Sequence, residues 1–241
     1  MDVLQVLQHF DEGRLATPYV GLEDLLKAVA DQVPVVSLAE GEAEGVSTVH
    51  ADSYGAARNA VRHLLELGHR KIIHLAGPAD RNEAGERVRG YLDELSEWNC
   101  DPQELIRCAE WDADSGAAVA AELNPQTFSA IFAANDEIAL GFMSAMRERD
   151  VLAPRDYSIV GVDDMPEARY FTPPLTSSRL NFERVGELGL EMLLQRIQDA
   201  GEERLQIVPS ILSLRASTRE VAEGKPSPAR GPRARRAVRA G

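Results

Sequence analysis

The chain has 241 residues, of which 44% are hydrophobic and 27% charged, enough apolar material for one large domain or for two lobes. No run of eighteen apolar residues occurs and the first residues lack the pattern of a secretion signal, so the sequence argues against a membrane or exported protein and favours the cytoplasm. The two cysteines and five histidines match no redox pair and no metal-ligand spacing, so neither a metal nor a cofactor is expected.

Charge is distributed unevenly along the chain. The formal net charge is -13, but residues 219–241 hold seven Lys/Arg against two Glu, which leaves 19 basic and 37 acidic residues in 1–218. An acidic body of this kind repels phosphate and does not suit a nucleic-acid surface. Residues 219–241 have little to bury and are predicted to be a disordered basic tail. We interpret the tail as a solubilising extension, with contact to DNA phosphates as the alternative.

The first fifty residues contain only about two strand-helix units. A helix is predicted at 4–10, a weak strand around 15–20, a helix at 22–29 and a strand at 33–38. These elements are too few to enclose a core, so a later segment of the chain must return to them. The long amphipathic helix predicted at 183–197 is the natural candidate.

From about residue 55, helix-like and strand-like segments alternate, which is the pattern of a parallel α/β sheet. Ser53 is predicted to cap the first helix, and Gly68 to end it. Further helices are predicted at 84–98, 115–123 and 136–149, and strands at 71–76, 104–108, 129–133 and 156–162. An extended piece at 175–178 precedes the long helix, and strands at 205–208 and 211–214 follow it. The predicted fold class is therefore α/β with parallel sheets.

Two segments place polar residues where an apolar run stops. One contains Asn135, and the other ends in Asp163 and Asp164. An open parallel sheet presents side chains to ligands at these strand ends, so the sequence predicts a small-molecule site. Asn135 can donate and accept at once, and Asp163 accepts from two hydroxyls, as a polyol requires. The alternatives are a helix N-cap for Asn135 and a solvated turn for the two aspartates.

An enzyme is not expected, and no catalytic residue is assigned. The sequence has no Gly-x-Ser-x-Gly elbow, phosphate-binding loop or metal-ligand cluster. Asp163 and Asp164 are adjacent, so on an extended chain they project in different directions, unlike an opposed acid/base pair.

Seven motifs, in order, resemble the effector-binding core of the LacI/GalR (lactose-repressor) family of transcriptional regulators. They are Leu67-Gly68-His69-Arg70-Lys71-Ile72, Ala76-Gly77-Pro78, Arg87-Val88-Arg89-Gly90-Tyr91, Ala134-Asn135-Asp136-Glu137-Ile138-Ala139-Leu140-Gly141, Val160-Gly161-Val162-Asp163-Asp164, Tyr170-Phe171-Thr172-Pro173-Pro174-Leu175-Thr176 and Arg215-Ala216-Ser217-Thr218. The likeness runs from about Val33 to Thr218. It implies a two-lobe type I periplasmic-binding-protein-like fold, with a ligand between lobes that three crossing segments connect.

Carried onto this chain, the resemblance implies a first lobe of residues 1–50 plus 179–203 and a second lobe of 51–178 plus 204–218. The family also has an amino-terminal helix-turn-helix headpiece, a hinge helix and a first strand-helix-strand stretch. The sequence shows no counterpart of these parts, so a first lobe that is truncated is expected.

The resemblance also implies roles for individual residues. Arg87 aligns with an effector-binding arginine, whose planar fork suits adjacent hydroxyls or a carboxylate. Trp111 falls where an aromatic ring lies against the flat face of the ligand, which suits a sugar or a purine. The alternatives are a surface arginine and a core tryptophan. Arg81 and Glu83, shortly before Arg87, are further ligand-binding candidates, with solvated loop charges as the alternative.

The function that the resemblance implies is the sensing core of a dimeric repressor. A small-molecule effector, most simply a sugar, changes the orientation of the lobes and so controls operator binding by the headpiece that is expected to be missing here. One rival is a sugar-binding transport component, which the missing export signal and the Arg215-Ala216-Ser217-Thr218 ending argue against. The other is a non-functional repressor fragment whose incomplete first lobe exposes a sheet edge.

Overall fold

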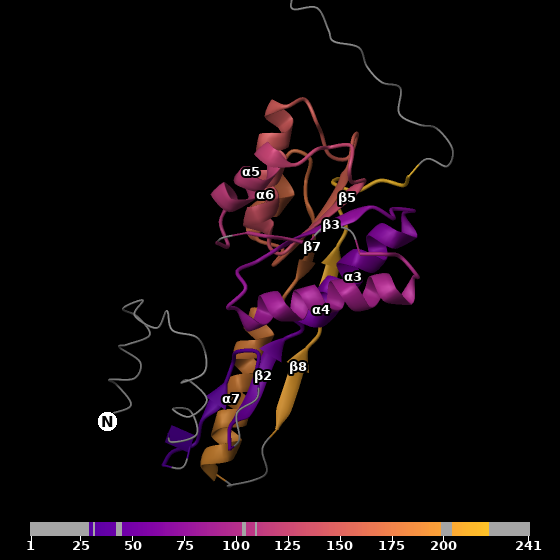
Figure 1. Cartoon of the computed structure of the whole chain (residues 1–241). Coiled ribbons are helices and arrows are strands. Elements are labelled where there is room, and N and C mark those ends of the chain that lie inside the picture. Colours follow the sequence, from indigo (N-terminus) through magenta and orange to yellow (C-terminus); the bar gives the residue numbers. More distant parts are fainter. Residues whose placement is uncertain are drawn as a thin grey trace, which may run out of the picture.

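The strands among the residues that the computed structural model describes form two sheets (Figure 1). The structure describes residues 29–30, 32–41, 45–102, 105–108, 110–198 and 204–221. The smaller sheet is parallel, with the order β1-β2-β8, and consists of β1 (Val36–Ser37), β2 (Ser47–Ala51) and β8 (Leu205–Val208). The larger sheet has the order β4-β3-β5-β6-β7-β9 and is parallel except for β9. Its strands are β3 (Ile72–Ala76), β4 (Leu105–Arg107), β5 (Ala130–Ala133), β6 (Ser158–Val162), β7 (Thr176–Arg179) and β9 (Ile211–Ser213).

Helices cover both faces of the larger sheet. On one face lie α3 (Ser53–Glu66) and α4 (Asn82–Glu97), and on the other α5 (Ala113–Glu122) and α6 (Asp136–Glu148) (Figure 1). A short 3-10 helix, η2 (Pro166–Tyr170), follows β6. The long helix α7 (Phe182–Gln198) packs against β1 and β2, which confirms the predicted return of this segment. Within the described part of the chain, no helix is long and apolar enough to cross a membrane.

Alternate residues of the central strands pack toward opposite faces. In β3, Ile72 belongs to the cluster under α3 and α4, whereas Ile73 belongs to the cluster under α5 and α6. Phe132 and Ile131 of β5 divide in the same way. Because both faces are covered, these strands are continuous apolar runs in the sequence rather than alternating ones. The predicted α/β fold class with parallel sheets is therefore confirmed.

One hydrophobic cluster extends from the larger sheet into the smaller part of the molecule. Val49 of β2, Val208 of β8 and Val185 of α7 belong to the same cluster as Leu64 of α3. All four side chains are buried. The two parts are thus joined by packed side chains as well as by the crossing segments.

The N-cap of α3 is Asp52, not the predicted Ser53. The carboxylate of Asp52 accepts a hydrogen bond of 2.7 Å from Gly55 N, and Ser53 is the first helical residue. Aspartate and serine are both good N-caps, and the apolar spacing locates a helix start only to within a residue or two. The sequence therefore favoured the wrong one of two neighbouring candidates.

The third crossing between the sheets lies later in the chain than the sequence indicated. Residues 204–218 were expected to belong to the second lobe, but β8 pairs with β2 in the smaller sheet. Only β9, which is antiparallel to β7, belongs to the larger sheet. Pro209 lies between the two strands and lacks an N–H donor, so it ends β8 at this point.

The predicted disordered tail begins too early. Arg219 N donates a hydrogen bond of 3.0 Å to Ser158 Oγ, and Val221 N donates one of 2.8 Å to Leu67 O. Residues 219–221 are therefore packed against the body. Residues 222–241 lie outside the described residues, as do the elements predicted between residues 4 and 28.

His69 connects three segments that are distant in the sequence. The residue is 3% exposed, with Nδ1 3.0 Å from Ser129 Oγ and Nε2 2.9 Å from Ser158 Oγ and 3.1 Å from the carbonyl oxygen of Arg219. Because that carbonyl can only accept, Nε2 carries the proton. Burial lowers the pKa of His69 from its usual 6.5 to about 4, so the ring is neutral at pH 7.

Acid is expected to weaken this connection. The folded pKa of His69 lies below the unfolded value, so its contribution to stability is present above pH 6.5 and is lost as the pH falls toward 4. Between pH 7 and pH 5 the loss is about 2 kcal/mol. Protonation of Asp136 has the opposite effect on stability as the pH falls, because burial raises the pKa of this carboxyl group to about 7. Urea unfolding of the wild type and of His69→Gln at both pH values separates the effect of the histidine from that of Asp136. The difference in unfolding free energy between the two proteins should be about 2 kcal/mol smaller at pH 5 than at pH 7. An unchanged difference would contradict the assignment of His69 as a buried neutral residue.

Candidate functional site

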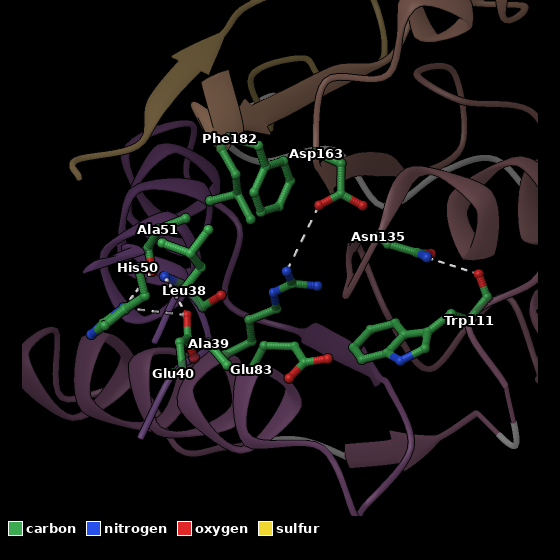
Figure 2. A pocket seen from close by; sticks show the side chains of 13 residues that line it. Leu38, Ala39, Glu40, His50, Ala51, Glu83, Trp111, Asn135, Asp163 and Phe182 are labelled. Carbon is green, nitrogen blue, oxygen red and sulfur yellow. Dashed lines mark hydrogen bonds and ion pairs between the residues drawn. The ribbon is translucent and has the colours of Figure 1, made fainter. Parts of the chain in front are cut away.

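A cavity of about 480 Å³ lies between the two sheets, where the carboxyl ends of several strands meet (Figure 2). The larger part of the molecule contributes Glu83, Arg87, Trp111, Asn135 and Asp163 to its lining. The smaller sheet and the crossing segments contribute Leu38, Ala39, Glu40, His50, Ala51, Ser53, Leu180 and Phe182. The volume falls in the range of small-molecule sites.

Arg87 is the most deeply buried charged residue of the cavity lining. Its side chain is 5% exposed and extends from α4. Nη1 donates a hydrogen bond of 2.7 Å to the carbonyl oxygen of Ala134, and Nη2 lies 3.7 Å from Asp163 Oδ1. Nε is buried and has no hydrogen-bond partner among the described residues. Because a buried donor without an acceptor is costly, Nε is suited to an acceptor atom of a ligand.

The indole ring of Trp111 forms an apolar wall beside this guanidinium. The centroid of the ring lies 5.3 Å from the guanidinium carbon of Arg87, within the range of a cation–π contact. A Cβ atom on Gly77 would overlap the ring, so the glycine of the Ala76-Gly77-Pro78 motif is required for the ring to lie there. This flat apolar face suits the C–H face of a sugar or a purine ring.

Asn135 has a structural role in addition to its place in the lining. Its side chain is the N-cap of α6: Oδ1 accepts a hydrogen bond of 2.8 Å from Ile138 N. Nδ2 donates one of 2.8 Å to the carbonyl oxygen of Trp111. The N-cap interpretation is therefore confirmed. Since Nδ2 has a second N–H, capping is compatible with a contact to a ligand.

Asp163 and Asp164 lie on a strained turn directly after β6. Their φ angles are 103° and 53°, in the left-handed region of the backbone that residues other than glycine rarely adopt. Asp163 N donates to Ser178 O, while the carboxylate of Asp164 contacts Arg215 Nη2 at 2.5 Å and Ser213 Oγ at 2.8 Å. Asp164 is therefore not a solvated turn residue. The turn directs only Asp163, with a side chain 35% exposed, to the cavity.

Asp136 fixes the position of this turn relative to α6. The residue is 1% exposed, and its Oδ1 accepts a hydrogen bond of 2.6 Å from Ser177 Oγ. Its Oδ2 accepts one of 2.9 Å from Met165 N, in the segment that follows the turn. Through these bonds the start of α6, where Asn135 lies, is connected to the segment that carries Asp163.

The structure brings five of the six predicted site residues to one cavity. They are Glu83, Arg87, Trp111, Asn135 and Asp163. Arg81 lies elsewhere: it precedes α4, is 3.9 Å from a carboxylate oxygen of Asp80, and borders a second cavity of about 670 Å³ beside β8. Its position does not favour contact with a ligand in the first cavity.

The opposite wall of the cavity was missed in the sequence. Glu40 follows β1, His50 lies at the end of β2, and Phe182, which is 61% exposed, follows β7. Each lies at or beyond the carboxyl end of a parallel strand. The rule that singled out Asn135 and Asp163, applied to these three strands, would have found them.

Two carboxylates of the cavity are affected by burial. The side chain of Glu40 is 9% exposed; Oε1 accepts from Ser53 N at 3.2 Å, and Oε2 has no hydrogen-bond partner among the described residues. Burial raises the pKa of Glu40, and the hydrogen bond from Ser53 and the charges of His50 and Arg87 act against it. Burial also raises the pKa of Asp163, and the Arg87 charge acts against it.

The cavity offers hydrogen-bonding groups and the aromatic side chains of Trp111 and Phe182. Guanidinium, amide and carboxylate groups converge on it from both parts of the molecule. Among the residues that the structure describes, no three His, Cys, Asp or Glu side chains are grouped so that they could hold a metal ion. The arrangement suits reversible binding of a polyhydroxylated or heteroaromatic molecule.

Comparisons with known proteins agree with this geometry. Residues 61–218 match the family model described as periplasmic binding protein-like domain. The chain is 31% identical over 204 residues to the HTH-type transcriptional repressor PurR of Edwardsiella ictaluri, covering 80% of this chain and 60% of that protein. It therefore spans less than two thirds of the length of this curated relative.

Solved structures of regulators have the same fold. A LacI family transcriptional regulator from Enterococcus faecium with bound ribose has a TM-score of 0.71 and 28% identity, covering 78% of this chain and 71% of that one. A dimeric Lac repressor has a TM-score of 0.75 and 29% identity, covering 81% of this chain and 72% of that one.

The family model covers well over half of the chain, and the structure explains several of the motifs. Gly77 makes room for Trp111, and Asp164 pairs with Arg215 of the last motif. The chain belongs to the periplasmic binding protein-like domain family, in the form of the effector-binding core of LacI/GalR regulators.

Proposed function

We propose that this chain is the effector-sensing part of a LacI/GalR transcriptional regulator and that a sugar binds in the 480 Å³ cavity. The observation that carries the proposal is the convergence of Arg87, Trp111, Asn135 and Asp163 on one cavity. The buried Nε of Arg87 needs an acceptor, and sugar hydroxyls both donate and accept. Ribose bound to the similar regulator from Enterococcus faecium supports a sugar over other small molecules.

The position of the cavity supports control by ligand. Its walls come from both parts of the molecule, and three crossings connect these parts: after β2, after β7 and between β8 and β9. A ligand that contacts both walls favours the arrangement in which both contacts are made. Binding therefore changes the relative orientation of the two parts.

The proposal extends to partners that such an orientation change would control. PurR is an HTH-type repressor, and the similar Lac repressor structure is dimeric. We propose that this chain forms a homodimer in the cytoplasm and acts on operator DNA through a helix-turn-helix headpiece. A transport component is the second candidate, because it shares the fold. The regulator is favoured, since both the curated relative and the solved structures are regulators. We also propose that the chain binds its ligand without catalysing a reaction.

A thermal-shift screen of sugars and purines tests the binding site. At least one sugar is expected to raise the melting temperature of the wild-type chain by several degrees, because a ligand at 100 times its Kd stabilises the folded state by about 2.7 kcal/mol. Asp163→Asn should remove most of the shift, since Asp163 accepts from ligand hydroxyls. Asp150→Asn, at an exposed position after α6, should keep it. A sugar whose shift is unaffected by Asp163→Asn would rule out this site.

A further inference from the structure

The cavity has an excess of negative charge. Of the charged residues that line it, Glu40, Glu83 and Asp163 carry carboxylates, whereas Arg87 is the one guanidinium within the described lining. Arg87 and Asp163 are 3.7 Å apart and neutralise each other in part. Among the described residues, neither Glu40 nor Glu83 has an ion pair as close as this one.

The neighbours of Glu40 compensate for its burial only in part: the hydrogen bond from Ser53 and the charges of His50 and Arg87 act against it. The nearest basic side chain in an ion pair is His50, with Nδ1 4.0 Å from Glu40 Oε1, which is too long for a hydrogen bond. That nitrogen donates instead to the carbonyl oxygen of Ala51, at 2.8 Å. Oε1 accepts from Ser53 N, and Oε2, in a side chain nine-tenths buried, has no partner among the described residues. A carboxylate in this position is suited to a strong donor from a ligand.

Glu83 adds a second acceptor on the same side of the cavity. It lies in the first turn of α4, is half-buried, and forms no ion pair with any residue that the structure describes. The charge of Glu83 contributes to the raised pKa of Asp163, so it acts electrostatically on a group of the cavity lining. In Figure 2, Glu40 and Glu83 both lie away from Asp163. A ligand between Trp111 and the smaller sheet would thus meet two carboxylates at one end and Asp163 at another.

We propose that the effector is an amino sugar whose protonated amine is held by Glu40 and Glu83 while its hydroxyls contact Asp163 and Arg87. This inference rests on the proposed function and names the chemical class of its ligand. An ammonium group supplies three donors, and a charge-assisted hydrogen bond is about twice as strong as a neutral one. A neutral sugar leaves the charge excess in place, and a sugar phosphate adds to it.

Calorimetric titration of the full chain with matched sugars tests the proposal. The probes are glucosamine, galactosamine and mannosamine, the parent hexose of each, and glucose 6-phosphate. At least one amine is expected to bind about tenfold more tightly than its parent hexose, since one charge-assisted hydrogen bond supplies that factor. Glucose 6-phosphate is expected to bind more weakly than glucose.

Variants of the two carboxylates identify the source of the preference. Glu40→Gln and Glu83→Gln preserve the size of the side chain but remove its charge, so each should lower the amine-to-hexose affinity ratio severalfold. Glu122→Gln, at the exposed end of α5, is the matched control and should leave the ratio unchanged.

The results separate this inference from the proposed function. A parent hexose that binds as tightly as its amine overturns the amino-sugar inference and leaves the sugar-sensing function standing. An amine preference that survives both glutamate substitutions also overturns the inference, because another group then provides the recognition. If none of the probes and no other sugar binds, both the inference and the sugar-sensing function are overturned.

Discussion

Gly141→Ala is expected to lower the free energy of unfolding by about 2–4 kcal/mol. A Cβ atom at Gly141, in α6, would overlap the carbonyl oxygen of Ala113 at the start of α5. The atom that the Cβ would overlap belongs to the helix backbone and not to a flexible side chain, so no change of rotamer can relieve the clash. Gly116 of α5 meets the carbonyl oxygen of Ile138 in the same way. To accept the methyl group, the two helices must separate and loosen the core around Phe142.

Gly186→Ala is the matched control for this prediction. Gly186 is exposed in α7, and no heavy atom lies within 4 Å of the position of an added Cβ. Alanine there should raise the free energy of unfolding by up to about 1 kcal/mol, because it lowers the conformational entropy of the unfolded chain and has a higher helix propensity than glycine. Urea unfolding of both variants checks the pair. A Gly141→Ala protein as stable as the wild type would show that α5 and α6 are not packed as described.

Arg87→Lys is expected to reduce sugar affinity about 100-fold, equivalent to about 2.7 kcal/mol. The guanidinium bonds to Ala134 O, faces Asp163 and keeps Nε for a ligand at the same time. A lysine ammonium has the charge but not the fixed planar fork, so it cannot occupy all three positions. It also loses the flat contact with Trp111.

The control for Arg87→Lys is Arg89→Lys, two positions further along α4. The side chain of Arg89 is 57% exposed, pairs with Glu86 and does not line the cavity. Calorimetry with the sugar that gives the largest thermal shift should show near wild-type affinity for this control. If Arg87→Lys also kept its affinity within about threefold, the guanidinium would not be a ligand-binding group.

The larger part of the fold is predictable because it is encoded locally. Strands such as Ile72–Ala76 and Ala130–Ala133 are short apolar runs between turn residues, and they lie within a residue or two of their predicted positions. The pairing of β8 is not local. Leu205–Val208 and Ile211–Ser213 are similar short strands separated by two residues, and the sequence does not show that they belong to different sheets.

The candidate site shows the same division between local and distant information. The strand-end rule and the family resemblance pointed to Arg87, Trp111, Asn135 and Asp163, and the structure places all four at one cavity. The ion pair of Asp164 with Arg215 joins residues 51 positions apart, so no pattern near either residue reveals it. Arg81 illustrates the reverse: it is near Arg87 in the sequence, yet it precedes the helix and borders another cavity.

Intrinsic fluorescence of Trp111 tests the central claim that a small molecule binds between the two sheets. The chain has two tryptophans, and the other, Trp98, caps the far end of α4 and does not line the cavity. Trp98→Phe leaves Trp111 as the only indole, so any change in its emission reports on the cavity wall. Titration with the sugar that stabilises the chain should give a saturable change in emission, with a Kd equal to the calorimetric one. A sugar that binds by calorimetry but leaves the emission of Trp111 unchanged would contradict the assignment of this cavity as the effector site.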